Sequence, residues 1–237
     1  MVHVSGSLSR LRPSAGIALG PILFILAILT ILAAVIAAGS GGFTANTTNE
    51  SAKADAETIL LYAKNLRDTV MLLTSNGCAD TQLNFYTLML GSYTNNITAP
   101  ADHSCDVFDP RGGNYVYKPL LPEMFDMSSS AVTARALYGS IFGISGVDVV
   151  PGVGTGQPQL IFLVYYIRPD ICQQLNILLG HLATPAVSTI NGSFFAGTYT
   201  ATTNLSSSVS GLDQACIASS SNQSTAVYIF YSVLKIR

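Results

Sequence analysis

The pattern of apolar and polar positions divides the chain into a first part that predicts helix and a later part that predicts strands. No charged residue lies between Arg12 and Glu50, and residues 17–38 inside this gap are almost all apolar. As a helix they would extend roughly 33 Å, enough to cross the apolar core of a bilayer, about 30 Å thick. Glycines at positions 39, 41 and 42 then disfavour helix, so residues 39–49 are expected to form a flexible joint.

Residues 50–75 show the spacing of an amphipathic helix. Lys64 and Asp68 stand four positions apart and can pair on its solvent side, and Asn76-Gly77 predicts its end. The apolar face consists of residues at three- and four-residue intervals: Ile59, Tyr62, Ala63, Leu66, Val70 and Leu73. We expect this helix to contribute to a core and to continue the apolar segment across the glycine joint.

The remainder of the chain favours a sheet. Residues 159–167 form an apolar run rich in β-forming side chains, and residues 225–236 alternate with both faces apolar, which predicts a strand inside a sheet. Weaker patterns predict a short strand at 115–117, helices at 131–142 and 171–179, and a strand at 193–202. The order indicates an α+β fold in which a long N-terminal helix packs on a C-terminal antiparallel sheet.

Composition narrows the function classes. The net charge is −2 and 10% of the residues are charged, against roughly 25% in ordinary soluble proteins. The sequence contains no basic cluster of useful size, which argues against nucleic-acid binding. The many Ser, Thr, Asn and Gly residues suit an extracytoplasmic protein or one with large subunit contacts.

The four cysteines, Cys78, Cys105, Cys172 and Cys216, all follow the apolar segment, and none forms a CxxC pair, which argues against a zinc site. Their even number predicts two disulfides in an oxidising compartment. Of the three possible connectivities, Cys78–Cys105 with Cys172–Cys216 is favoured because each bond then closes a local loop. The alternative is four buried thiols in a reducing compartment.

The flanks of the apolar segment predict its orientation. Arg10 and Arg12 precede it without an acidic residue, so the positive-inside rule places residues 1–16 in the cytoplasm and the later domain outside. A cleaved secretory signal is the main alternative. Its apolar region would run about 7–15 residues, which is shorter than this one, although residues 37–40 have the small side chains that a signal peptidase accepts.

These features together resemble the type IV pilins and the pseudopilins of type II secretion. Arg10, Arg12 and Gly16 resemble the basic leader that a prepilin peptidase removes, and cleavage after Gly16 would make Ile17 the first mature residue. The family usually has Glu at the fifth mature position, where this chain has Pro21. Some minor, tip-located members of the family also lack that Glu.

The resemblance implies four parts. Residues 1–16 would be the leader, and residues 17–38 a transmembrane helix that becomes the filament core on assembly. Residues 39–49 would be the glycine-rich joint, and residues 50–237 a pilin-like extracytoplasmic domain.

Catalytic chemistry is sparse in the sequence. Asp102, His103 and Cys105 are close along the chain, but sequence neighbours rarely converge on one point, and a disulfide is the better role for Cys105. His181 follows Gly180 at a predicted helix end, where an imidazole commonly meets the last carbonyls. We therefore expect no catalytic residue, no cofactor and no bound metal.

Three further patterns have weaker interpretations. Glycines 152, 154 and 156 precede a strand without a following Lys-Ser/Thr, so they predict a turn and not a nucleotide loop. Asp102, Asp106 and Asp109 could supply oxygen ligands to Ca²⁺, but their spacing is not that of an EF-hand, and a solvated acidic loop is the simpler interpretation. Six Asn-x-Ser/Thr sequons become glycan acceptors only in a host with the glycosylation machinery; they begin at Asn46, Asn49, Asn96, Asn191, Asn204 and Asn222.

The leading interpretation is a non-enzymatic structural subunit of an extracellular or periplasmic filament. Its N-terminal helices would join it to itself or to related pilin-like subunits, and it would sit in the cytoplasmic membrane before assembly. The alternatives are a single-pass membrane-anchored binding module without a filament and a secreted enzyme with a cleaved signal peptide.

Overall fold

A computed structural model of the protein describes residues 19–86, 96–126, 143–190, 195–199, 204–220 and 226–237, and the side chains of these residues except at 19–28, 31–48 and 143–147. The chain divides into two compact units, Met1–Thr48 and Asn49–Arg237. The boundary falls within the first helix, α1 (Leu19–Ser75). The predicted leader and cleavage position, Gly16 and Ile17, lie outside the described residues, as does the helix predicted at 131–142.

In the second unit, α1 is the amphipathic helix that the sequence predicts for residues 50–75. The predicted apolar face is buried, and Ala52 and Ala56 extend it toward the start of the unit. On the solvent side, the Nζ atom of Lys64 lies 2.6 Å from the Oδ2 atom of Asp68. The helix ends where predicted. Gly77 adopts a left-handed conformation (φ +100°), which terminates the helix.

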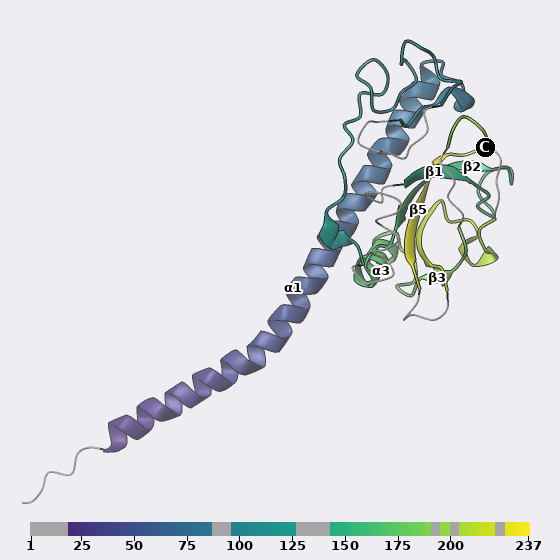
Figure 1. Cartoon of the computed structure of the whole chain (residues 1–237). Helices are drawn as coiled ribbons and strands as arrows, with labels where there is room; N and C mark the ends of the chain where they lie inside the picture. The colour runs from purple at the N-terminus through teal and green to yellow at the C-terminus, as the bar shows by residue number, and fades with distance from the viewer. Residues whose placement is uncertain (1–18, 87–95, 127–142, 191–194, 200–203, 221–225) are drawn as a thin grey trace, which may run out of the picture. The chain divides into compact units, whose positions relative to one another are not determined.

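Within the part of the chain that the structure describes, five strands form one sheet in the order β1-β2-β5-β4-β3 (Figure 1). They are β1 (Gly143–Asp148), β2 (Gln159–Tyr165), β3 (Ala186–Val187), β4 (Gln214–Ala218) and β5 (Tyr228–Lys235). Strand β5 pairs antiparallel with both β2 and β4, which confirms the predicted internal position. The short edge strand β3 pairs parallel with β4, so the expectation of a purely antiparallel sheet is wrong at this edge.

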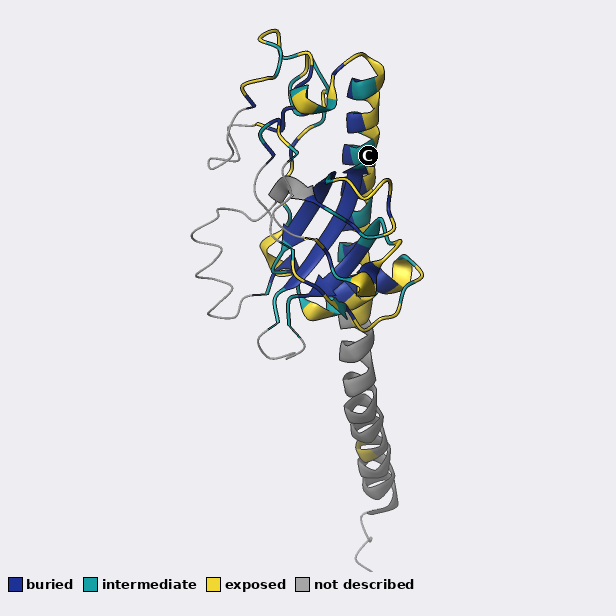
Figure 2. Ribbon diagram, turned by 90° about the vertical axis from the view of Figure 1, so that its right-hand side faces the viewer, coloured by how far each residue is buried: buried dark blue, intermediate teal, exposed yellow. Residues whose placement is uncertain are grey.

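Both faces of the sheet are buried, and each belongs to a different core (Figure 2). On one face Leu160, Phe162 and Phe230 pack with the apolar side of α1 and with helix α3 (Pro169–Leu178). On the other face Ile161 and Tyr231 pack with apolar residues of the loops that follow β1 and precede β4. The described second unit is therefore an α+β domain, as predicted.

Three short 3₁₀ turns complete the described elements: η1 (Asp80–Gln82), η2 (Pro122–Met124) and η3 (Ser207–Val209). The helix predicted at 171–179 is confirmed as α3. The strand predicted at 115–117 is wrong: Tyr115 donates its backbone N–H to the carbonyl of Val107, but these residues lie outside every strand ladder. The described residues 195–199 of the strand predicted at 193–202 are also irregular.

None of the helices, over the residues that could be searched, combines the length and apolar character needed to cross a membrane. The backbone of residues 39–49 is helical as part of α1 (Leu19–Ser75), so the interruption of the helix expected at Gly39, Gly41 and Gly42 is wrong. Within residues 17–38 only the side chains of Leu29 and Thr30 are described, so the transmembrane helix stays a prediction.

Candidate functional site

The loop formed by residues 96–121, which precedes η2, holds the described residues with the most chemical potential. The disulfide Cys78–Cys105 joins the middle of this loop to the chain just after α1, with the two Cα atoms 5.7 Å apart. Backbone hydrogen bonds then join the loop to the segment after η1: Asn84 donates to the carbonyl of Cys105 at 3.1 Å, and Val107 donates to the carbonyl of Asn84 at 2.8 Å. The loop is therefore fixed both to the end of α1 and to the residues that follow η1.

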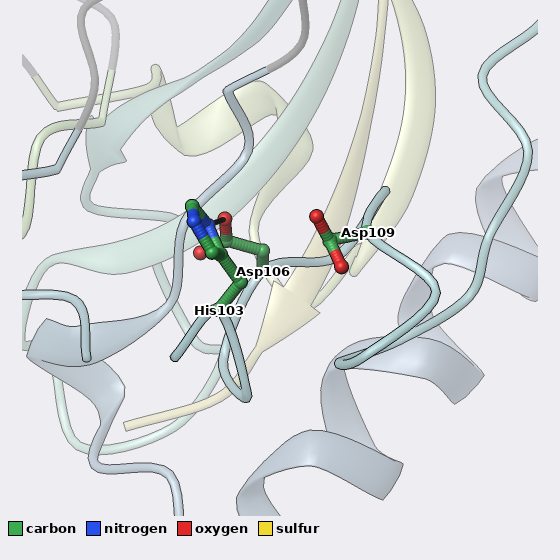
Figure 3. Close-up of side chains that lie close together, drawn as sticks. All are labelled: His103, Asp106 and Asp109. Atoms are coloured by element: carbon green, nitrogen blue, oxygen red, sulfur yellow. Dashed lines mark hydrogen bonds and ion pairs between the residues drawn. The ribbon is translucent and has the colours of Figure 1, made fainter. Parts of the chain in front are cut away.

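His103, Asp106 and Asp109 converge in this loop (Figure 3). One ligand atom from each lies within 4.8 Å of the others. The Nδ1 atom of His103 is 2.7 Å from Oδ2 of Asp106, and the side-chain amide of Asn84 donates to Oδ1 of Asp106 at 3.0 Å. Asp106 is only 5% exposed. Each oxygen of this buried carboxylate thus has a protein partner in place of water.

Asp109 has its own positive partner. The guanidinium of Arg111 donates to both of its carboxylate oxygens, at 2.9 Å each, and the backbone N–H of Arg111 adds a third bond. These hydrogen bonds hold the pKa of Asp109 well below its ordinary value. The carboxylate therefore stays charged and is compensated within the loop.

One imidazole and two carboxylates form a donor set that suits divalent transition metals. In this arrangement, however, Arg111 opposes a second cation beside Asp109, and Asp106 is already bonded on both oxygens. A metal would have to displace the guanidinium and the imidazole contact. The geometry favours a network of hydrogen bonds and ion pairs that fixes the loop, and not a metal centre.

The structure corrects the expected membership of this cluster. Asp102, which the sequence grouped with Asp106 and Asp109, is exposed, and one of its oxygens accepts a hydrogen bond from the backbone N–H of Ser104. That bond lowers the pKa of Asp102. His103 takes its place, with its Nδ1 atom beside Asp106. Its backbone is left-handed (φ +63°), a conformation that a sequence pattern does not reveal.

The other residues that the sequence analysis considered for catalysis or nucleotide binding have structural roles. Cys105 is disulfide-bonded. The expectation that His181 meets the carbonyls of its own helix is wrong: its Nε2 atom lies 3.0 Å from the carbonyl of Gln214 in β4. Glycines 152, 154 and 156 form a turn with positive φ at each glycine.

The second disulfide, Cys172–Cys216, joins α3 to β4, with Cα atoms 5.4 Å apart. The two bonds are the pairings that the sequence favours. Disulfides persist in oxidising environments and are rare in the cytosol, so they indicate an extracytoplasmic location for the domain.

No protein-family model matches the sequence, and neither the curated proteins nor the solved structures contain a match to the chain.

Asn84 and Arg111 were not singled out from the sequence, although both complete the cluster. Arg111 had one available signal, because the residues Asp109-Pro110-Arg111, with glycines at 112 and 113, favour a turn and place a carboxylate and a guanidinium close together. Asn84 had none, since its contact with Asp106 joins two loops that are separate in the sequence.

Proposed function

We propose that the protein is a structural, pilin-like subunit of an extracytoplasmic filament that assembles through its N-terminal apolar segment. The observation that carries the proposal is the burial of one face of α1 from Ala52 to Leu73 within the core of the second unit. The part of α1 that follows the apolar segment is thus a central element of the domain.

This burial has a mechanical meaning for an assembling subunit. A helix held in the domain core by many apolar contacts can transmit force between the domain and whatever binds the preceding segment. The two disulfides support the same proposal because a subunit exposed outside the cell has to remain folded without chaperones.

Pro21 shapes the proposal. With Pro at the position where the family usually carries Glu, subunit register would depend on apolar packing of residues 17–38 and not on a charge. Proline is tolerated in the first turn of a helix, since its missing N–H would be unpaired there in any case. A minor or tip-located subunit fits this substitution better than a major one.

The mature N-terminus tests the proposal directly. We expect mass spectrometry of the protein from its native membrane to find Ile17 as the first residue, and immunogold labelling to find the protein on filaments. Gly16→Leu should leave the leader in place and abolish labelled filaments. The matched control Gly6→Leu, within the same leader, should be processed normally.

Other outcomes point to the alternative functions. Retention of Arg10 and Arg12 in a detergent-soluble monomer, with no filament, would contradict the proposal and support an anchored binding module. A first residue near Gly39 would show signal-peptidase cleavage and a secreted protein.

A further inference from the structure

The glycosylation sequons of the chain lie in contrasting environments. The structure describes the side chains of three of the six acceptor residues: Asn49, Asn96 and Asn204. An N-linked glycan is bulky and hydrated, so the fold can accept it only where the asparagine side chain reaches solvent. The three positions can therefore be compared for their ability to carry one.

Asn96 cannot carry a glycan in the folded protein. It is 2% exposed, and its Nδ2 atom donates to the carbonyls of Thr81 at 2.7 Å and Leu83 at 2.8 Å. Its Oδ1 atom accepts from the backbone N–H of Thr98 at 2.9 Å. A glycan would replace one of the amide hydrogens and would have no space in the interior.

Asn49 is exposed but lies within α1. Sequons that are used as acceptors belong to surface loops. We therefore assign no glycan to Asn49.

Asn204 has the features of an acceptor. It is exposed and lies outside the helices and strands, in the loop that leads to η3. The next residue, Leu205, is buried in the second core and donates its N–H to the carbonyl of Val149 at 3.0 Å. The loop is thus anchored by its neighbour while the Asn204 side chain faces solvent.

We propose that Asn204 is a glycosylation site that receives an N-linked oligosaccharide from a lipid-linked glycosyl phosphate donor. The Nδ2 atom would form a bond to the anomeric carbon of the first sugar, and the bond between that carbon and the phosphate oxygen would break. One amide proton would pass to the solvent, and the lipid phosphate would leave. The proposal rests on the extracytoplasmic location indicated by the disulfides, and it does not depend on filament assembly.

A glycan at Asn204 would lie beside the edge of the sheet. The hydroxyls of Ser206 and Ser208 in the same loop each donate to the carbonyl of Val187 at 3.1 Å. Val187 belongs to the edge strand β3, and the residue is 45% exposed. Exposed edge strands invite pairing with other chains, so a hydrated oligosaccharide here would shield the edge.

The test is to produce the full chain in a host that exports it and glycosylates sequons, and to measure the occupancy of each sequon by glycopeptide mass spectrometry. We expect Asn204 to be occupied and Asn96 to be unmodified in the folded, disulfide-bonded protein. Asn204→Gln and Ser206→Ala should each remove this glycan, whereas Ser206→Thr should keep it. Circular dichroism of each variant checks that a lost glycan does not reflect misfolding.

An unmodified Asn204 in folded exported protein would overturn the proposal, whether or not other sequons are occupied. Occupancy at Asn96 in the folded protein would overturn the structural reasoning that separates the two sites. Retention of the glycopeptide signal at Asn204 in Ser206→Ala would show that the modification does not use the sequon.

Discussion

The side-chain amide of Asn96 forms hydrogen bonds with backbone groups in the irregular segment that follows α1. Its Nδ2 atom binds two carbonyls, and its Oδ1 atom binds the backbone N–H of Thr98. The side chain therefore determines the path of this loop. A sequence pattern identifies Asn96 only as a sequon, because its burial depends on contacts made after the chain folds.

We predict that Asn96→Asp will lower the free energy of unfolding by about 2–4 kcal/mol. The substitution removes both N–H donors and places a carboxylate against two carbonyl oxygens in the interior. Urea denaturation of the variant and the parent measures the difference. The control is Asn204→Asp, where the same change is exposed and should cost under about 0.5 kcal/mol; equal losses in the two variants would contradict the role given to Asn96.

Two glycines of one turn provide a matched pair. Gly154 and Gly156 both have positive φ, at +67° and +76°. A Cβ atom at Gly154 would lie 2.2 Å from the backbone carbonyl oxygen of Arg237, whereas a Cβ at Gly156 would meet nothing within 4 Å. Both positions require a positive φ, but only Gly156 has room for a side chain.

We predict that Gly156→Ala will cost about 1–2 kcal/mol, which is the penalty of a left-handed alanine. Gly154→Ala should cost at least about 1 kcal/mol more, because its Cβ also has to displace the backbone at Arg237. Thermal melting of both variants gives the comparison. A smaller loss for Gly154→Ala than for Gly156→Ala would show that the close approach is not maintained in solution.

At the scale of elements, α1 presents two different faces within the second unit. Leu66 is fully buried against the sheet, and Leu61 is 59% exposed on the opposite side. Tyr62 stacks on Phe162 of β2, with ring centroids 5.8 Å apart. The apolar contacts of the inner face thus hold the helix on the sheet.

We predict that Leu66→Ala will destabilise the domain by about 3 kcal/mol through lost burial and the cavity that remains. Leu61→Ala makes the same chemical change on the same helix and should alter stability by less than about 0.5 kcal/mol. Guanidinium denaturation followed by circular dichroism checks both. A large effect of Leu61→Ala would instead indicate that the outer face is covered in solution.

The elements that could be predicted from the sequence are those with a strong apolar period or a continuous apolar run. The helix at 50–75 and the strand at 225–236 have such a period, the strand at 159–167 is a continuous apolar run of β-forming residues, and each is present in the structure. Strand β1 (Gly143–Asp148) contains two glycines, and β3 has only two residues. Both owe their pairing to neighbouring strands, so local sequence gave no signal for them.

The candidate cluster was partly predictable for a related reason. Asp106 and Asp109 stood out because carboxylates close in sequence suggest a shared site. The contribution of His103 involves a left-handed backbone conformation, and that of Asn84 depends on a contact between two loops. Such long-range contacts follow from the assembled fold.

At the scale of the whole molecule, each disulfide closes one loop of the domain, and these two loops are called the stapled regions below. They close loops with sequence separations of 27 and 44 residues. In the chain-entropy relation such loops stabilise the folded state by about 3.5 and about 4 kcal/mol. Both bonds connect buried cysteines, so they also contribute to the larger core.

We predict that the double substitution Cys172→Ala/Cys216→Ala will lower the free energy of unfolding by about 4 kcal/mol. Cys78→Ala/Cys105→Ala should cost slightly less, since it opens the shorter loop. Urea unfolding under oxidising conditions measures both variants, and the parent protein with a reducing agent should lose stability to a similar or greater extent. No loss in either variant would contradict the structural role of the bonds.

The position of the two bonds also determines how the domain would respond to tension. Neither disulfide encloses α1 or β5, because the stapled regions run from Cys78 to Cys105 and from Cys172 to Cys216. A pull applied through these two elements would therefore bypass both covalent links. Resistance would come from the hydrogen bonds of β5 to β2 and β4 and from the apolar inner face of α1.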